Sequence, residues 1–325
     1  MSALSEAAPA SPLHLEYAGA SLTPAGVPAA GSGSASKPPA ASPSASEPPA
    51  ASPPAASPPA ASPPAASPPA ASPPAASPSP AGCWAPLPPG SFEVRSGEYL
   101  ASGVKAPSAA GAFEVVSITP VNSDFVMTGL CSNFLPLKRL VERHPGETFF
   151  VTNRACPCGG GRIRNMITVA RRTLPVGADP AFDSAWARYR ASSDAHRDLH
   201  MKYLPRLGRA PWLLTQAVAA LGGSRPVIMG KGYLAQVHDV GPNFVEVCVD
   251  ISSSAVARRI AGLVLGYSAS LDVDEAFVIE GKEQADLPER VLYQVRLQGV
   301  DTEAAAVDLK EGDYIAPPVA NDAEQ

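Results

Sequence analysis

The sequence predicts an α+β domain in which a curved, mostly antiparallel sheet packs on a few helices. Three observations lead to this fold class. Predicted strands follow one another instead of alternating strictly with helices. Phe244–Ile251 alternates with a period of two, which is typical of a strand, and Ala255–Gly266 carries an apolar face at helical spacing. A long segment rich in Pro, Ala and Ser precedes this domain, and we predict that it is disordered.

The composition divides the chain into residues 1–82, 83–303 and 304–325. The first part contains five copies of Ser-Pro-Pro-Ala-Ala over Ser52–Ala76 and lacks the apolar residues that offset chain entropy. We interpret it as a solubilising or spacing tail, with a ligand for proline-binding modules or a phosphorylated tail as alternatives. The second part is long enough for one domain. The third part is predicted to be an acidic tail.

Charge is distributed unevenly along the chain, whose formal net charge is −5. Cys131–Lys231 contains 16 Lys or Arg against 6 Asp or Glu, whereas Val237–Gln325 contains 6 against 17. The basic middle and the acidic end can pair within the fold, or give it one basic face suited to phosphates or anionic lipid. A solvated surface is the simpler interpretation.

Cysteine usage and hydropathy bear on the compartment. The five cysteines are odd in number and lack the spacing of a disulfide scaffold, which favours a reducing compartment such as the cytoplasm. No apolar run approaches the roughly 18 residues that span a bilayer. The first residues lack the pattern of a signal peptide.

The elements before residue 210 follow from alternation and amphipathic spacing. The predicted strands are Phe92–Arg95, Tyr99–Leu100, Phe113–Ile118, Thr148–Asn153 and Ile163–Val169, the last two joined by a Gly-rich turn. The predicted helices are Pro136–Arg143 and Pro180–Arg190, the second with Phe182, Trp186 and Tyr189 on one side. No element is assigned to Ser192–Arg209.

The elements after residue 210 form the densest apolar stretch. Trp212–Leu221 is predicted as a helix that Gly222-Gly223 ends. Val227–Val237 is predicted to pair with Phe244–Ile251 across the turn Gly241-Pro242-Asn243. Ser253 or Ser254 is expected to cap the helix Ala255–Gly266, which has a narrow polar stripe and should be nearly buried. Strands of the same sheet then follow, at Leu271–Ile279 and Tyr293–Leu297.

The motifs that could carry chemistry are weak. Cys156-Pro157-Cys158 has too short a spacing for zinc, and we interpret it as a hairpin turn. Gly230-Lys231-Gly232 fails the phosphate-loop pattern, so Lys231 is expected to be an exposed strand residue. No Gly-x-Ser-x-Gly motif is present. We therefore predict no metal and no cofactor.

Histidines and carboxylates do not form a recognisable catalytic set. His196 and His200 are four apart and are expected to be a surface pair. Asp250 is expected to stabilise the following helix N-terminus. Asp272 and Asp274 are expected to face solvent. An enzyme would require Asp250, Ser252 and His238 to meet in a pocket, and this hypothesis ranks last.

Several short motifs resemble the plant and algal family named after the C-terminal domain of the enhanced disease resistance 2 protein. They are Cys83-Trp84, Phe92–Arg95, Pro211–Leu214, Met229–Lys231, Val247–Ala257, Leu263–Tyr267, Ala276–Lys282 and Leu287–Arg290. In larger members this domain follows a pleckstrin-homology module and a START lipid-binding module. The resemblance implies a link to phosphoinositide-containing membranes and to restraint of plant defence. It supplies no catalytic residue.

Taken together, these observations favour a non-enzymatic domain that binds a lipid or an anionic membrane surface, in the cytoplasm and peripheral to the membrane. The expected lipid contacts are Arg171, Arg172, Arg206, Arg209 and Lys231. The alternative is a protein-interaction module whose Pro-rich tail recruits partners. No nucleic-acid partner is expected. A cavity of several hundred Å³ next to Ala255–Gly266 would favour a lipid or another small molecule, and a filled core would favour a surface role.

Overall fold

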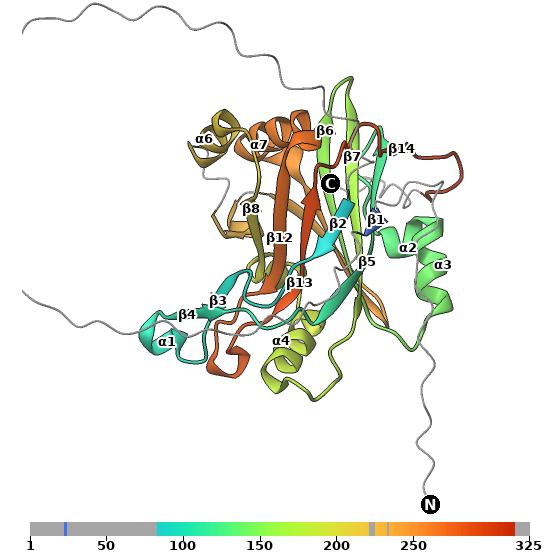
Figure 1. The fold of residues 1–325 in the computed structure, drawn as a ribbon. Coiled ribbons are helices and arrows are strands. Elements are labelled where there is room, and N and C mark those ends of the chain that lie inside the picture. Colours follow the sequence, from blue (N-terminus) through green and yellow to red (C-terminus); the bar gives the residue numbers. More distant parts are fainter. Residues whose placement is uncertain (1–22, 25–82, 221–224, 233, 316–325) are drawn as a thin grey trace, which may run out of the picture. The chain divides into compact units, whose positions relative to one another are not determined.

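The computed structural model describes residues 23–24, 83–220, 225–232 and 234–315 (Figure 1). The predicted disorder of residues 1–82 and the predicted helix stop at Gly222-Gly223 therefore lie almost wholly outside the described residues. Thr23 and Pro24 form a short strand that pairs with Cys83 and Trp84. No described helix is long and apolar enough to cross a membrane.

Helices and strands succeed one another along the described chain. The helices are α1 (Tyr99–Ser102), α2 (Leu130–Asn133), α3 (Leu135–Arg143), α4 (Pro180–Ala191), α5 (Asp194–Asp198), α6 (Trp212–Ala220) and α7 (Ala255–Gly266), with short 3-10 helices η1 (Met229–Gly232), η2 (Ile251–Ser253), η3 (Ser268–Ser270) and η4 (Gln284–Asp286). The strands are β1 (Thr23–Pro24), β2 (Cys83–Pro86), β3 (Glu93–Arg95), β4 (Lys105–Pro107), β5 (Phe113–Ser123), β6 (Phe149–Cys158), β7 (Arg162–Arg172), β8 (Met201–Leu207), β9 (Val227–Ile228), β10 (Ala235–Val240), β11 (Phe244–Asp250), β12 (Asp272–Ile279), β13 (Val291–Gln298) and β14 (Val307–Asp308).

The fold is α+β and its sheets are mostly antiparallel, as the sequence predicted. Most strands belong to two six-stranded sheets, with the orders β1-β2-β13-β12-β8-β9 and β10-β11-β6-β7-β5-β14, here called the first and second sheet. Only β1 with β2, β11 with β6 and β14 with β5 pair in parallel. The two sheets lie face to face (Figure 1). The period-two pattern did not reveal this division between two sheets.

The packing of strand β11 explains the regular alternation of its sequence. Val245, Val247 and Val249 pack between the two sheets, while Phe244 packs on the opposite side, near α2 and α3. The turn at Gly241-Pro242-Asn243 is confirmed, because β10 pairs antiparallel with β11 on either side of it. The predicted partner at Val227–Val237 is only partly right, since β9 pairs with β8 instead.

The chain leaves the extended conformation between β9 and β10 at Gly230. A Cβ atom at this position would lie 2.7 Å from the carbonyl oxygen of Asp198, so the close approach requires glycine. The chain turns there through η1, which separates the two short strands. Lys231 is exposed on this turn instead of lying in a strand.

The core between the sheets is aromatic at one end. The rings of Phe150 and Phe277 lie 6.1 Å apart, and that of Tyr293 lies 5.3 Å from Phe277. Helix α4 covers this end with the predicted face of Phe182, Trp186 and Tyr189, all buried. Each such ring removes a large apolar area from water, so this half of the core is filled.

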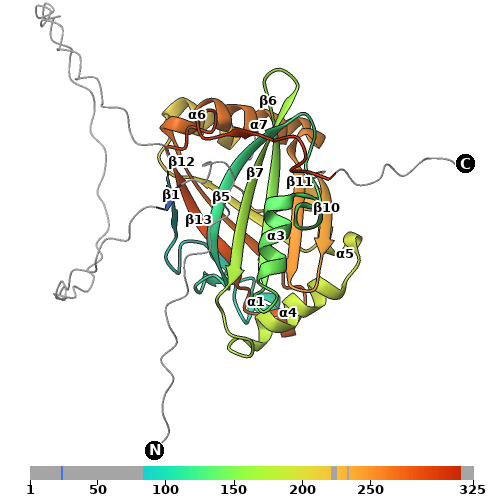
Figure 2. The ribbon, with the colours of Figure 1, turned by 90° about the vertical axis from the view of Figure 1, so that its right-hand side faces the viewer.

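The outer faces of the sheets are covered separately. Helices α2 and α3 lie against the second sheet (Figure 2), where Leu137 and Leu140 are buried against Val151 and Ile167. The short β3–β4 hairpin covers the first sheet with Phe92 and Val94. The predicted strand at Tyr99–Leu100 is wrong. It is helix α1, which ends at Gly103 with a φ of 69°.

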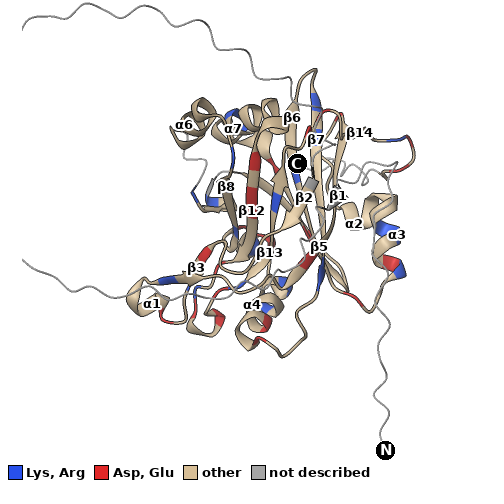
Figure 3. Cartoon of the chain, in the orientation of Figure 1, with Lys and Arg blue, Asp and Glu red and all other residues tan. Residues whose placement is uncertain are grey.

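Asp274 on β12 is fully buried, which corrects the expectation that Asp272 and Asp274 face solvent. Arg206 and Arg296 donate to its carboxylate at 2.6 Å from β8 and β13, the strands on either side of β12. Figure 3 shows basic and acidic positions on these neighbouring strands. Burial acts to raise the pKa of Asp274, but these hydrogen bonds outweigh it and lower the pKa below its ordinary value. The neighbouring Asp272 is half-buried, 3.6 Å from Arg209.

Ion pairs join the basic middle of the chain to its acidic end. The basic partners all lie within residues 131–231 and the acidic partners within 237–325, so much of the charge asymmetry is neutralised inside the fold. These pairs are Arg154–Glu275, Arg164–Glu303, Arg188–Asp286, Lys202–Glu289 and Arg206–Asp274.

The fold continues past residue 303, where the sequence predicted a tail. Strand β14 pairs with β5, and Phe134 and Tyr314 form an isolated bridge. The Tyr314 hydroxyl donates to the carbonyl of Thr128 at 2.6 Å. The residues after 315 lie outside the described chain.

Glu246 is a buried carboxyl group on the outer side of β11. Its Oε2 accepts from the backbone N–H of Cys131 at 2.9 Å, and its Oε1 has no partner among the described residues. Burial raises the pKa of Glu246 to about 7. The folded protein therefore keeps this proton at pH values where the unfolded chain, with an ordinary pKa near 4.5, has lost it.

We predict that the contribution of Glu246 to stability falls as pH rises from about 4.5 to 7 and stays low above that. Glu246→Gln should remove this decline, and relative to the unsubstituted protein it should gain on the order of 3 kcal/mol by neutral pH. Urea unfolding across this pH range measures the effect. Glu142→Gln on the exposed side of α3 is the control and should leave the profile unchanged. A parallel decline in both variants would contradict the assignment.

Candidate functional site

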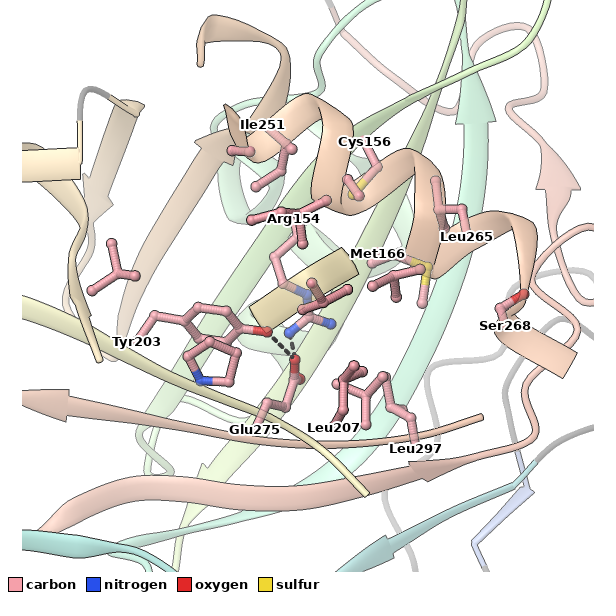
Figure 4. Close-up of a pocket in the computed structure, with 18 of the residues that line it drawn as sticks. Arg154, Cys156, Met166, Tyr203, Leu207, Ile251, Leu265, Ser268, Glu275 and Leu297 are labelled. Atoms are coloured by element: carbon pink, nitrogen blue, oxygen red, sulfur yellow. Dashed lines mark hydrogen bonds and ion pairs between the residues drawn. The ribbon is translucent and has the colours of Figure 1, made fainter. Parts of the chain in front are cut away.

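A cavity of about 440 Å³ lies between the sheets beneath α7 (Figure 4), next to the aromatic core, whose Phe277 contributes to its lining. Its volume falls within the roughly 300–1,000 Å³ of small-molecule pockets. The first sheet contributes Leu207, Val273 and Leu297, and the second contributes Met166. The cavity lining is predominantly apolar, with a few polar groups on one side.

Helix α7 covers this cavity. Ile260, Ala261, Val264 and Leu265 line it from one side of the helix. Ser254 caps α7, since its hydroxyl accepts from the backbone N–H of Ala257 at 3.4 Å. The predicted cap and apolar face are both present.

The expectation that this helix is nearly buried is wrong, because no residue of α7 is buried. Its apolar side lines the cavity, and Ile260, Leu263 and Val264 also pack against a small cluster that includes Leu214 and Val218 of α6. An apolar helix face over empty space is free to contact a ligand.

The polar end of the cavity is built by a charged pair that joins the sheets. Arg154 on β6 and Glu275 on β12 point toward each other and form an ion pair. Tyr203 on β8 donates its hydroxyl to Glu275 Oε2 at 3.1 Å. Arg154 Nη2 also donates to Thr168 Oγ1 at 3.1 Å. The cavity therefore has mostly apolar walls with one buried charged pair among them.

Strand alternation places these groups inside. Phe150, Thr152, Arg154 and Cys156 are spaced by two on β6 and share its inner face, while Phe149 and Val151 face α3. The hydroxyl groups of Thr152 and Tyr293 share a hydrogen bond of 2.8 Å next to the charged pair. The pair thus separates the filled aromatic half of the core from the cavity.

Electrostatics keep Arg154 in its charged form. Burial acts to lower the pKa of Arg154, but the Glu275 carboxylate outweighs it and raises the pKa above its ordinary value. Burial, and then the charge of Glu275, raise the pKa of Tyr203, so its hydroxyl keeps the proton that it donates. Burial likewise raises the pKa of Cys156 to about 11, so this thiol is protonated at neutral pH.

The five predicted lipid contacts do not form one patch. Arg171 lies 3.8 Å from both Glu114 and Glu147, and Arg172 pairs with Asp183, all on or near the second sheet. Arg206 and Arg209 belong to the first sheet and the segment after it. Lys231 is exposed on η1. Of these, Arg206 is the one that lines the cavity, and their roles stay predictions.

The hypothetical Asp250, Ser252 and His238 triad is not assembled. The Ser252 hydroxyl donates to Asp250 at 2.6 Å, and Asp250 also accepts from the Ser252 backbone N–H. Asp250 thus caps the short helix η2, and Ser254 caps α7. His238 lies 2.8 Å from Asp198 instead. In register, Asp250 pairs with Ala235, three residues before His238 on β10.

The remaining motifs adopt local structural roles. Cys156, Pro157 and Cys158 end strand β6 and pair with β7, so the turn that was predicted there lies at residues 159–161, with Gly160 and Gly161 at positive φ. His196 and His200 stack with ring centroids 3.7 Å apart. No group of three or more His, Cys, Asp or Glu in the described part of the chain is arranged to hold a metal ion.

Arg154 and Glu275 were not proposed from the sequence. Glu275 follows Asp272 and Asp274 in a run that resembles an exposed strand, and Arg154 follows Thr152 and Asn153. The available signal was the alternation of each strand. Arg154 lies on the opposite face of β6 from Val151, and Glu275 lies on the opposite face of β12 from Ala276, so both point inward.

In the comparison with protein families, one domain family matches this chain. The family model described as Protein ENHANCED DISEASE RESISTANCE 2, C-terminal matches residues 84–301. The chain belongs to this family. The resemblance noted in the sequence is therefore confirmed, and the matched range covers the charged pair, α7 and the strands of both sheets other than β1 and β14.

One curated relative of this enhanced disease resistance 2 C-terminal domain is the Protein ENHANCED DISEASE RESISTANCE 2-like of Arabidopsis thaliana. It is 33% identical over 130 residues, which are 40% of this chain and 17% of that protein. The aligned part thus covers less than a fifth of that relative's length. No solved structure matches the chain.

We predict that the two charges at the cavity end depend on each other. Glu275→Met alone should cost about 3–5 kcal/mol in the free energy of unfolding, because it leaves Arg154 charged and unpaired in the interior. The double variant Arg154→Met and Glu275→Met should recover most of that loss. Urea unfolding of the three proteins provides the measurement. A double variant as unstable as the single one would show that the pairing does not matter.

Proposed function

We propose that this domain is a non-enzymatic lipid-binding domain that holds an apolar ligand in the cavity beneath α7. The cavity is the observation that supports the proposal. It has the volume of a small-ligand pocket and mostly apolar walls, with one buried charged pair, Arg154 and Glu275, among them. A long apolar chain would fill the space that α7 now covers.

The packing around the cavity supports ligand binding over a purely structural role. A dry apolar void in a core costs stability because the atoms that line it lose contacts. Ile260, Val264 and Leu265 would regain these contacts from a bound hydrocarbon. Half-exposed apolar residues of α7 would then be buried between the ligand and the helix.

We predict that filling the cavity from α7 prevents ligand binding. Ala261→Trp places an indole in the space that the ligand would occupy. Diphenylhexatriene, an apolar probe that fluoresces in dry surroundings, should bind the unsubstituted full chain and bind the variant at least about tenfold more weakly, which corresponds to roughly 1.4 kcal/mol.

Ala255→Trp is the matched control for this experiment. Ala255 is exposed at the start of α7 and does not line the cavity, so the same substitution there should leave probe binding unchanged. Equal binding by both variants, or no binding by the unsubstituted chain, would refute the cavity as a ligand site.

A second observation favours docking on an anionic membrane at the same end of the molecule. The exposed residues of the two covering helices are here called the α6–α7 face: Trp212, Leu213, Val256, Arg258, Arg259 and Tyr267. Trp212 and Leu213 are 71% and 73% exposed. Neither α6 nor α7 contains an acidic residue, and Arg258 and Arg259 form no ion pair with a described residue. Apolar side chains flanked by arginine suit the interface of an anionic bilayer.

We predict that Arg258→Glu with Arg259→Glu weakens binding of the full chain to phosphatidylserine vesicles by about tenfold or more, since each basic residue contributes on the order of 1 kcal/mol near such a surface. Vesicle flotation at low and high salt measures this. Arg139→Glu with Arg143→Glu, on the exposed side of α3, reverses the same charge away from the face and should have little effect. Equal losses in both double variants would argue against a defined docking face.

A further inference from the structure

The charged pair at the cavity end has hydrogen-bonding capacity left on both partners. Arg154 carries five N–H donors, and its hydrogen bonds within the described chain go to Glu275, Thr168 and the Tyr293 hydroxyl, from Nη1 and Nη2. Its Nε donates to no described residue. Each oxygen of Glu275 accepts one hydrogen bond, from Arg154 or from Tyr203, and can accept another.

The other polar groups of the lining have partners of their own. Arg206 pairs with Asp274 and donates to the carbonyl of Ser91. Ser268 and Thr302 share a hydrogen bond of 3.1 Å, and Ser254 caps α7. The Arg154–Glu275 pair is therefore the place in this lining where a donor and an acceptor lie together with unused capacity. Its two charges cancel, so the site as a whole is neutral.

A ligand group that suits this pair must donate and accept while carrying no charge. A hydroxyl group can accept from Arg154 and donate to Glu275 at once. A carboxylate would bring a second negative charge next to Glu275, and an ammonium group would face Arg154, in a dry interior where such repulsion is strong. A hydrocarbon without a polar end would leave the unused donors unpaired.

We propose that Arg154 and Glu275 bind the hydroxyl group of a neutral lipid whose apolar body fills the cavity under α7. This inference rests on the proposed lipid-binding function and specifies the class of ligand. A long-chain alcohol or acylglycerol and a sterol share this chemistry, a single neutral hydroxyl end on an apolar body. A bound hydroxyl would join the two sheets through the ligand, in addition to the ion pair that already joins them.

The test compares probes that differ only at their polar end. Displacement of diphenylhexatriene from the unsubstituted full chain is measured with hexadecanol, hexadecane and palmitate, and separately with sitosterol and its methyl ether. The hydroxyl member of at least one set should bind about tenfold to a hundredfold more tightly than its partners, as expected for a hydrogen bond to charged groups. The set that shows the preference distinguishes a chain alcohol from a sterol.

Glu275→Gln provides a specificity switch. Because it removes the negative charge and keeps Arg154, the preference should move from hexadecanol toward palmitate. Glu246→Gln is the matched control, since Glu246 is also buried but lies on the outer side of the second sheet, away from the cavity. The control should keep the preference of the unsubstituted protein. If the switch variant does not fold, the comparison of probes on the unsubstituted chain still decides.

The outcomes separate this inference from the function on which it rests. Binding of diphenylhexatriene with equal affinity for hydroxyl, ether and hydrocarbon probes, or with palmitate bound most tightly, would overturn the hydroxyl assignment and leave the lipid-binding function intact. Failure of every probe to bind would overturn both.

Discussion

The ion pair between Arg154 and Glu275 is the interaction on which this structure depends. It joins the second sheet to the first across the interior, at the level where the packed half of the core gives way to the cavity. On one side, Phe150, Phe277 and Tyr293 fill the space between the sheets. A desolvated charged pair needs further hydrogen-bond partners, and Tyr203 and Thr168 supply two of them from the neighbouring strands.

This arrangement explains how the fold can have a tightly packed core in one half and a cavity in the other. The aromatic half, closed by α4, fixes the separation of the sheets through large buried rings. The other half is closed by α7, which has no buried residue and packs against α6, β6 and η2. Stability is therefore concentrated at the end away from the cavity, so a ligand could enter without disturbing the aromatic core.

The sequence predicted the parts of the fold that depend on local patterns. Alternation identified β11, and amphipathic spacing identified α4 with Phe182, Trp186 and Tyr189. It failed where burial depends on distant segments. Asp274 looks solvent-exposed in its own strand, and only the arginines of β8 and β13 and the cover of β3–β4 make it a core residue. The charge asymmetry allowed two interpretations, and the ion pairs support pairing within the fold.

The candidate site was harder to predict because a cavity is a property of the whole packing. The apolar face of α7 was evident, but the sequence cannot tell whether such a face meets side chains or empty space. The inward positions of Arg154 and Glu275 follow from strand alternation once the two-sheet arrangement is known. Without it, each looks like an ordinary surface charge.

The short strand β14 has a practical consequence for work on this domain. It covers part of the outer edge of β5, where Leu309 N–H donates to the Asn122 carbonyl at 2.8 Å, and Arg162 and Asn122 both contact Asp308. An uncovered strand edge is a template for self-association. Recombinant versions of the domain that end at the family boundary near residue 301 would lack this cover, so the expressed chain should extend at least to Ile315.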